Sequence, residues 1–228
     1  MNTVILTWNP ALSDYKTEQF RDDFLTVVDG DTPQIAWPVG PDERCKDADR
    51  FFMIRQGMGS TGICMAGYFY SDAFEDDDWE GEGKRFKVSI DPLVMINTER
   101  GEHLSLKDLK TAIPTVNWEA ITSGTVISEE EAGKLEDMWL AFLYKNITHT
   151  EDGHIAVSDD FDLEDFESIP ASLQTYYKKN IRNTCERCGK SEQEVNELAF
   201  HFVWDDNDDT STPLLKRLHC YCNECWFG

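Results

Sequence analysis

The residues with the clearest chemistry are four cysteines in two C-x-x-C pairs, Cys185 with Cys188 and Cys222 with Cys225, separated by 33 residues. A two-residue spacer lets both thiolates of one tight turn face the same ion, and tetrahedral zinc binds four such ligands at about 2.3 Å. Gly189, which follows Cys188, suits a turn with a positive φ. The sequence therefore predicts a structural Zn²⁺ site, which has no open position for catalysis.

The sequence leaves two questions about this ligand set open. Cys220 could replace Cys222, and His219 is a weaker candidate. The cysteine runs could also be coincidental or form disulfides, although their spacing matches known zinc patterns. Cys45 and Cys64 stand alone in the N-terminal half and are expected to be reduced thiols. Thiols kept for zinc suit a reducing compartment, so we expect a cytoplasmic protein.

Composition restricts the range of partners. With 228 residues, 40% hydrophobic and 12% aromatic, the chain can build one large or two small domains. No apolar run approaches the roughly 18 residues of a membrane span, and the N-terminus does not resemble a signal peptide, so no membrane partner is expected. The net charge of -23 repels a nucleic-acid duplex unless basic residues cluster on one face. A net charge of this size usually serves to keep a protein soluble.

Hydrophobic periodicity predicts the elements that must position these residues. Strands are expected at 2–8, 51–55, 63–70 and 84–96, and helices at 16–28, 105–112, 128–144 and 171–182. Residues 37–40 are predicted to open a loop. A glycine-rich turn at 56–62 joins two strands and lacks the Gly-Lys-Ser/Thr of a phosphate loop. Ser128 and Glu131 form a capping box.

A polar, acidic stretch at 148–167 is predicted to be a linker. It divides the chain into a first domain at 1–147 and a second domain at 168–228. The mixture of strands and helices indicates an α+β fold.

The N-terminal pattern resembles the EVE-like branch of the PUA superfamily over about residues 1–145. The resemblance is carried by Trp8-Asn9-Pro10, Asp49 with Phe51-Phe52, the glycine hairpin with Gly62-Ile63 and Gly67, Trp79, and Asn117-Trp118 followed by Ser123-Gly124 and Ile127. It implies a mixed β-barrel with flanking helices that reads modified or flipped-out bases in an aromatic pocket. The residues it places in that pocket are Trp8, Asn9, Trp37, Trp79, Trp118 and Ser123. Alternatively, several of these tryptophans are ordinary core residues.

The C-terminal unit resembles the zinc-stabilised ββα-metal (HNH, treble-clef) endonuclease domain, with His201 on the strand that carries the general base. The fusion of these two domains is similar to modification-dependent endonucleases. Three positions depart from the pattern: Phe200 replaces a metal ligand, Leu214-Leu215 replace an asparagine, and Trp226 replaces the final histidine. Asp205, Asp206, Asp208 and Asp209 could bind a hard cation, but such acidic loops are usually only solvated. A nuclease centre that has lost its activity is therefore expected, and His201 is catalytic only if the nuclease is active.

Three functions follow from these observations. The first is a reader of modified DNA or another nucleic acid that has lost its nuclease activity. The second is an active modification-dependent nuclease, and the third is an acidic module that binds a protein partner. A basic stripe beside the pocket would favour the first function, and its absence would favour the third; the residues concerned are Arg50, Arg55, Lys84, Arg85 and Lys87.

Overall fold

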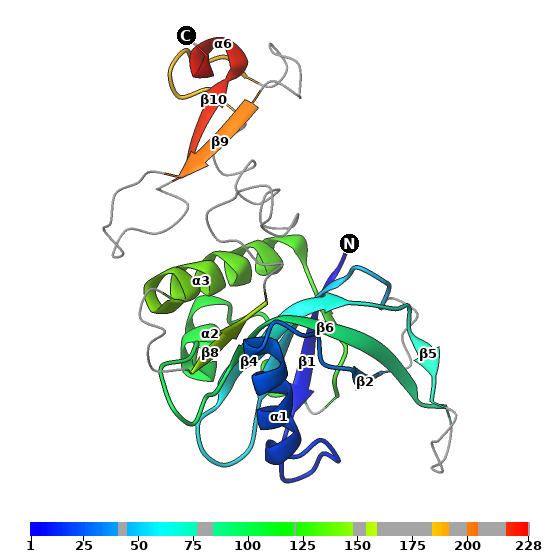
Figure 1. Ribbon diagram of the computed structural model, residues 1–228. Helices are drawn as coiled ribbons and strands as arrows, with labels where there is room; N and C mark the ends of the chain where they lie inside the picture. Colours follow the sequence, from blue (N-terminus) through cyan, green and yellow to red (C-terminus); the bar gives the residue numbers. More distant parts are fainter. Residues whose placement is uncertain are drawn as a thin grey trace.

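The computed structural model describes residues 1–40, 45–76, 84–120, 122–147, 154–158, 184–191, 200–204 and 218–227. Residues up to 158 form a large mixed sheet with three helices, α1 (Thr17–Val28), α2 (Leu106–Ala112) and α3 (Glu129–Ile147) (Figure 1). The described residues from 184 onward belong to a small unit with strands β9 (Phe200–Trp204) and β10 (Leu218–Cys222) and the short helix α6 (Asn223–Trp226). We call it the metal unit, because it carries the four predicted metal ligands. The chain therefore has a mixed α+β architecture.

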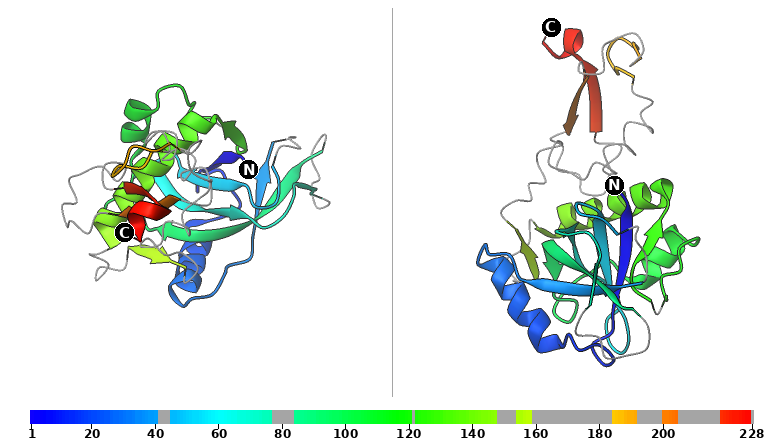
Figure 2. Two further views of the ribbon diagram at one scale, coloured as in Figure 1. Left: turned by 90° about the horizontal axis from the view of Figure 1, so that it is seen from above. Right: turned by 90° about the vertical axis from the view of Figure 1, so that its right-hand side faces the viewer.

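The large sheet has the strand order β2-β6-β4-β3-β1-β7, and β5 and β8 each pair with β6. Its strands are β1 (Thr3–Trp8), β2 (Ile35–Val39), β3 (Arg50–Arg55), β4 (Gly62–Phe69), β5 (Phe74–Glu75), β6 (Phe86–Ile96), β7 (Thr125–Ile127) and β8 (Ile155–Val157). Strands β1 and β3 are parallel, whereas the other pairs are antiparallel. The sheet curls strongly around its long axis (Figure 2).

Both faces of the sheet are covered, which explains why every residue of β3 is buried. Alternate side chains of a strand point to opposite faces. Ile5 and Phe52 therefore join a core that α2 and α3 complete, while Leu6 and Phe51 join a second core that α1 completes. The ends of β1 and β3 are consequently fixed from both sides, and this fixes the residues that follow them.

Hydrogen bonds around Ser123 and Gly124 join the segments beside β2 and β7, the two outermost strands of this order, and hold β7 against β1. The Gly40 amide, after β2, donates to the Ser123 carbonyl at 3.1 Å, and the Gly124 amide, before β7, donates to the Ile5 carbonyl at 3.0 Å. The Trp37 indole donates to the Ser123 hydroxyl at 3.1 Å. The curled sheet is therefore compatible with a barrel-like fold that closes near Ser123.

This closure requires a glycine at position 124, which leads to a first prediction. Gly124 has a φ of 97°, and an added Cβ would lie 3.1 Å from the Gly40 amide nitrogen. Gly124→Ala is expected to lower the free energy of unfolding by about 1–3 kcal/mol, because an L side chain is strained in this conformation. Urea denaturation measures this loss.

The facing glycine provides the matched control. A Cβ on Gly40 would lie 3.7 Å from the Ser123 carbonyl oxygen, an ordinary contact at a φ that any residue tolerates. Gly40→Ala should therefore change the stability little. Equal losses in both variants would contradict the role assigned to Gly124.

Most of the predicted elements agree with the structure to within a few residues. The capping box is confirmed, because the Ser128 amide donates to the Glu131 carboxylate at 2.8 Å. The loop predicted at 37–40 is wrong for residues 37–39, which belong to β2. Pro38 is tolerated there because β2 lies at the edge of the described strands and pairs with β6.

Two further predictions concern the chain beyond α3. Within the segment predicted to be a linker, the described residues 154–158 include β8, which pairs with Val94–Ile96 of β6. Its Ile155 and Ala156 are buried, so they add to the sheet despite the polar surroundings in sequence. The helix predicted at 171–182 lies outside the described residues. Of the helices that the structure describes, none has the length and apolar character to span a membrane.

Candidate functional site

The first C-x-x-C pair lies in a tight hairpin at residues 184–191. The Cys185 amide donates to the Lys190 carbonyl at 2.9 Å, and the Gly189 amide donates to the Cys185 carbonyl at 2.8 Å. Gly189 has a φ of 74°, as its position after Cys188 predicts. This geometry turns Cys185 and Cys188 toward the same point.

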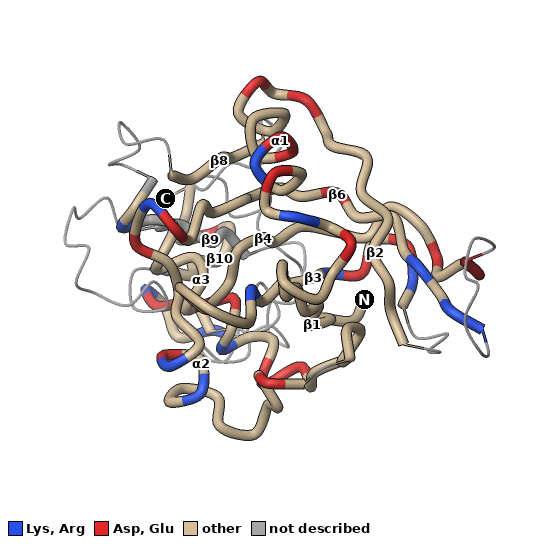
Figure 3. The backbone as a smooth tube through the Cα atoms, turned by 90° about the horizontal axis from the view of Figure 1, so that it is seen from below, with Lys and Arg blue, Asp and Glu red and all other residues tan. Residues whose placement is uncertain are grey.

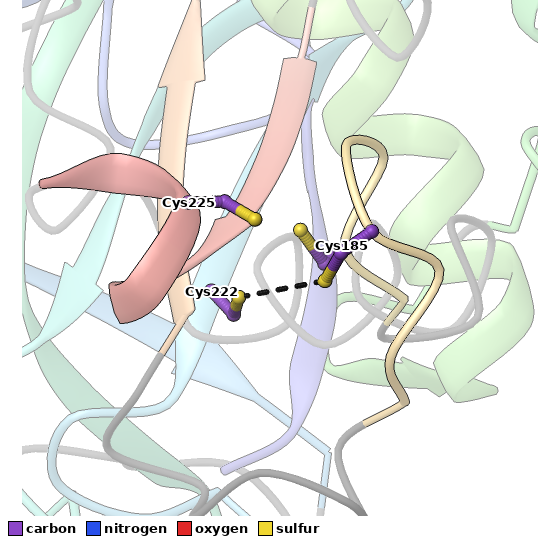
Figure 4. Close-up of side chains that lie close together, drawn as sticks. Cys185, Cys222 and Cys225 are labelled. Atoms are coloured by element: carbon purple, nitrogen blue, oxygen red, sulfur yellow. Dashed lines mark hydrogen bonds between the residues drawn. The ribbon is translucent and has the colours of Figure 1, made fainter. Parts of the chain in front are cut away.

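The second pair lies where β10 ends and α6 begins. Cys222 is the last residue of β10, and Cys225 lies in the single turn of α6. The side chains of Cys185, Cys222 and Cys225 point toward one another in Figure 4, and the ligand atoms of all four cysteines lie within 4.8 Å of one another. The Cys188 and Cys222 sulfurs are 3.7 Å apart. Zn–S bonds of about 2.3 Å in a tetrahedron require sulfurs about 3.8 Å apart, so the cluster could hold such a metal ion.

Backbone groups of both cysteine pairs prepare one sulfur for binding a cation. Burial raises the pKa of the Cys185 thiol, but hydrogen bonds from the backbone of Cys222, Cys188 and Arg187 outweigh it and lower the pKa to about 6. Burial and the neighbouring thiols raise the pKa of Cys225 to about 12. A bound cation would deprotonate the remaining thiols.

Polar contacts join the two cysteine pairs and place the alternative ligands, His219 and Cys220, outside the sulfur cluster. Lys190 pairs with Glu224 at 2.6 Å, and the Glu186 amide donates to the Cys220 carbonyl at 2.9 Å. The His219 ring lies 2.8 Å from the Glu186 carboxylate, and neither His219 nor Cys220 belongs to the sulfur cluster. The predicted set of four cysteines is therefore the set that the structure brings together.

A cavity of about 1020 Å³ lies beside the point where the sheet closes. Three residues predicted for the base pocket line it together: Asn9, Trp37 and Ser123. The other lining residues that could contact a ligand through an aromatic, polar or charged group include Tyr15, Gln56, Asp76, Arg85 and Lys87. We call this space the large cavity.

The structure places the other predicted pocket residues elsewhere. Trp8 is 1% exposed, stacks on Phe20 with ring centroids 4.8 Å apart, and lines a different, smaller cavity. Trp118 is also 1% exposed and donates to the Ile113 carbonyl at 2.9 Å, so it is part of the core. Large aromatic side chains bury well, and sequence alone does not separate the two roles. Trp79 lies outside the described residues.

Sequence reasoning missed Tyr15 and Gln56. The Tyr15 ring meets Trp37 edge-on with centroids 5.4 Å apart, and its hydroxyl donates to Asp23 at 2.6 Å. Burial, helped by this bond, raises the pKa of Tyr15, so the hydroxyl stays protonated. The Gln56 amide donates to the Trp118 and Ala120 carbonyls. The turn signal at Asn9-Pro10 could have drawn attention to the residues that follow it.

The predicted basic stripe is largely neutralised. Arg50 is 1% exposed and pairs with Glu136 at 2.8 Å, while Arg55 pairs with Glu99 at 2.9 Å. The three others also have acidic partners, in the pairs Lys84–Glu75, Arg85–Asp76 and Lys87–Asp76. Figure 3 shows that basic and acidic positions are interspersed along the chain. Of the five, Arg85 and Lys87 line the large cavity, and they share the carboxylate of Asp76.

Comparisons with known proteins assign no family. No protein-family model matches the chain, and no curated protein matches it significantly. Among solved structures, it is similar to a hypothetical protein from Leishmania major, with 11% identity, a TM-score of 0.38, and coverage of 60% of this chain and 94% of that one. It is also similar to Rpa0253 from Rhodopseudomonas palustris, with 13% identity, a TM-score of 0.36, and coverage of 57% and 87%.

The predicted nuclease positions are only partly described. His201 lies in β9, opposite Tyr221 of β10, and Phe200 is paired with Cys222. Trp226, at the position of the expected final histidine, is 44% exposed in α6. The leucines at 214–215 and the aspartates between 205 and 209 lie outside the described residues.

Proposed function

We propose that the large cavity binds one modified nucleobase, in an EVE-like barrel, and that the cysteine cluster holds a structural zinc in a degenerate HNH-like unit. The protein would then read modified DNA or another nucleic acid without cutting it. The curled sheet with flanking helices, and the order β9, β10, α6 in the metal unit, both suit this assignment.

The observation that carries the proposal is the lining of the large cavity. Its volume of about 1020 Å³ lies at the upper end of ligand pockets in proteins. Tyr15 is half-buried and provides aromatic surface, and stacking on such surface contributes about 1–3 kcal/mol per base. Trp37 is 2% exposed, so it acts mainly by holding the Tyr15 ring and the Ser123 hydroxyl in place. Asn9, Gln56 and Ser123 provide the polar groups that a flipped base needs along its hydrogen-bonding edge.

Trp37→Ala tests the cavity. We expect binding of a short oligonucleotide that contains 5-methylcytosine or 5-hydroxymethylcytosine to weaken at least tenfold, because Trp37 positions the Tyr15 ring and the Ser123 hydroxyl that line the cavity. The wild type should prefer the modified oligonucleotide over its unmodified counterpart, and its affinity should fall as salt rises. Fluorescence anisotropy at two salt concentrations measures both effects.

Two variants keep this test interpretable. Trp37→Phe retains a ring and should retain part of the affinity, which separates the positioning of Tyr15 from a loss of fold. Trp226→Ala removes an exposed indole from the metal unit and should change nothing, because Trp226 does not line the large cavity. If the wild type binds modified and unmodified oligonucleotides equally, the proposed reading of modifications is wrong.

The proposed zinc would have a structural role, with Cys185, Cys188, Cys222 and Cys225 as its ligands. Four thiolates fill the tetrahedron, so the ion would fix the hairpin to α6 and activate no water. An active nuclease would need a second metal near His201 together with a base to activate water. Cleavage of modified DNA with Mg²⁺ or Mn²⁺ would support that alternative and exclude the loss of activity proposed here.

A second candidate function is a regulatory module that binds a protein partner. The observation that favours it is the pairing of all five predicted stripe residues with carboxylates, in a chain with a net charge of -23. Oligonucleotide binding that is absent at low salt would favour this candidate, since electrostatic attraction to phosphates is strongest there.

A further inference from the structure

A second, smaller cavity of about 210 Å³ lies at the ends of β1 and β3. Its lining includes Trp8 and three arginines, Arg21, Arg55 and Arg100. A water molecule occupies about 30 Å³ in the liquid, so the cavity can hold an ion several times larger. We call this space the arginine cavity.

Arg55 has hydrogen-bond donors that its neighbours do not use. A guanidinium has five N–H donors. Arg55 makes three hydrogen bonds, to the Met58 and Ser60 carbonyls and to the Glu99 carboxylate. At least two donors therefore have no partner among the described residues, on a side chain that is only 6% exposed and lines the cavity. These donors are available to water or to an anion in the cavity.

The two other arginines add charge at the same place. Arg21 lies on α1, and Arg100 lies after β6. Within the described part of the chain, neither takes part in an ion pair, unlike most of its lysines and arginines. Two carboxylates, Glu18 and Glu99, also line the cavity, so three cations face two anions. This local excess of positive charge is notable because the chain as a whole has a net charge of -23.

The arginine cavity and the large cavity lie on opposite sides of the same strand ends. Trp8 of β1 is paired with Arg55 of β3, and both line the arginine cavity. The next residues, Asn9 and Gln56, line the large cavity. The Trp8 ring meets the Tyr15 ring edge-on at 5.7 Å, and Tyr15 lines the large cavity. The contact between the Trp8 and Tyr15 rings therefore lies between the two cavities.

We propose that the arginine cavity binds a phosphate group. A planar guanidinium with unused donors matches phosphate oxygens, which accept two parallel hydrogen bonds from it. Because this step rests on the proposed function of the large cavity, the phosphate is assigned to the nucleic-acid backbone beside the base that the large cavity holds. Free inorganic phosphate has the same chemistry and is the other source.

Titration of the full chain with inorganic phosphate at constant ionic strength tests the site. We expect saturable NMR shifts of the Arg55 Nε–H signal and of backbone amides at Thr98 and Glu99. Arg21→Gln/Arg100→Gln should weaken the affinity at least tenfold, because it removes both unpaired cations. Lys107→Gln/Lys110→Gln removes the same charge from α2 and should have no such effect, since neither lysine lines the cavity. No saturable shift, or equal affinity in both double variants, would overturn the proposal.

A second arm identifies the source of the phosphate. A modified oligonucleotide is compared with one in which the linkage next to the modified base is an uncharged methylphosphonate. A loss of affinity that disappears in Arg21→Gln/Arg100→Gln supports a backbone phosphate, whereas no loss overturns that assignment in favour of free phosphate. Trp37→Ala should leave the phosphate titration unchanged, so a failure of base reading and a failure of the arginine cavity give different results.

Discussion

Replacing Cys222 with serine is expected to remove the metal and to unfold the unit that begins at 184. Purified wild-type protein should contain about one zinc per chain, and the variant should contain almost none. Small domains bind structural zinc with apparent free energies of about 10–16 kcal/mol, so the loss of one thiolate ligand has a large effect. Elemental analysis measures the metal, and limited proteolysis should cut the variant first within the metal unit.

The matched control is Cys220→Ala. Cys220 precedes Cys222 by two residues on β10 and is equally buried, but it lies outside the sulfur cluster. This variant should keep its zinc, whereas a chelator should reproduce the behaviour of Cys222→Ser in the wild type. A wild-type protein that is fully folded without metal, with its four thiols reduced, would contradict a structural role for zinc.

Glu136→Gln is expected to destabilise the large sheet by about 3–5 kcal/mol, because it leaves a buried guanidinium without its counter-charge. Arg50 and Glu136 are 1% and 0% exposed, and the Arg50 Nε donates to the carboxylate at 2.8 Å. Arg50 also donates to the Gly67 carbonyl at 3.0 Å and lies over the Phe52 ring at 4.6 Å. A charge buried in such a site is costly unless it is paired and hydrogen-bonded.

Urea denaturation followed by tryptophan fluorescence measures this loss. Glu130→Gln is the matched control, because it makes the same change on the same helix in a pair with Lys134 whose side chains are 70% and 44% exposed. Exposed pairs of this kind contribute about 0.5 kcal/mol or less. A loss for Glu136→Gln as small as that of the control would show that Arg50 finds another partner.

The sequence predicts those features that short stretches determine. The cysteine spacing and Gly189 determine a local turn, and the Ser128–Glu131 box determines where α3 begins, because their interactions join residues a few positions apart. The sequence also identified Asn9, Trp37 and Ser123 by resemblance, and the structure brings these three together. Long-range pairing was harder to predict. Strand β8 is short and surrounded by polar sequence, and its pairing with β6 and the burial of Ile155 and Ala156 stabilise it.

The electrostatic partners show the same limit. Arg50 and Arg55 looked like candidates for a basic surface, yet both are buried against carboxylates that lie 86 and 44 residues away in sequence. Conversely, no sequence pattern singled out Arg21 and Arg100, because they meet Arg55 only after α1 and the end of β6 pack beside it. Which side of a strand end each residue faces depends on the register of β1 and β3, and that register follows from the assembled sheet.

The position of β1 between β3 and β7 affects how the protein folds as it is synthesised. Strand β1 pairs on one side with β3 and on the other with β7, whose residues are translated more than 110 positions later. Until then one edge of a strongly apolar strand stays without its partner, a situation that favours aggregation of nascent chains. Folding of this unit should therefore be slow for its size and should benefit from chaperones, since most of its sheet pairing joins distant parts of the chain.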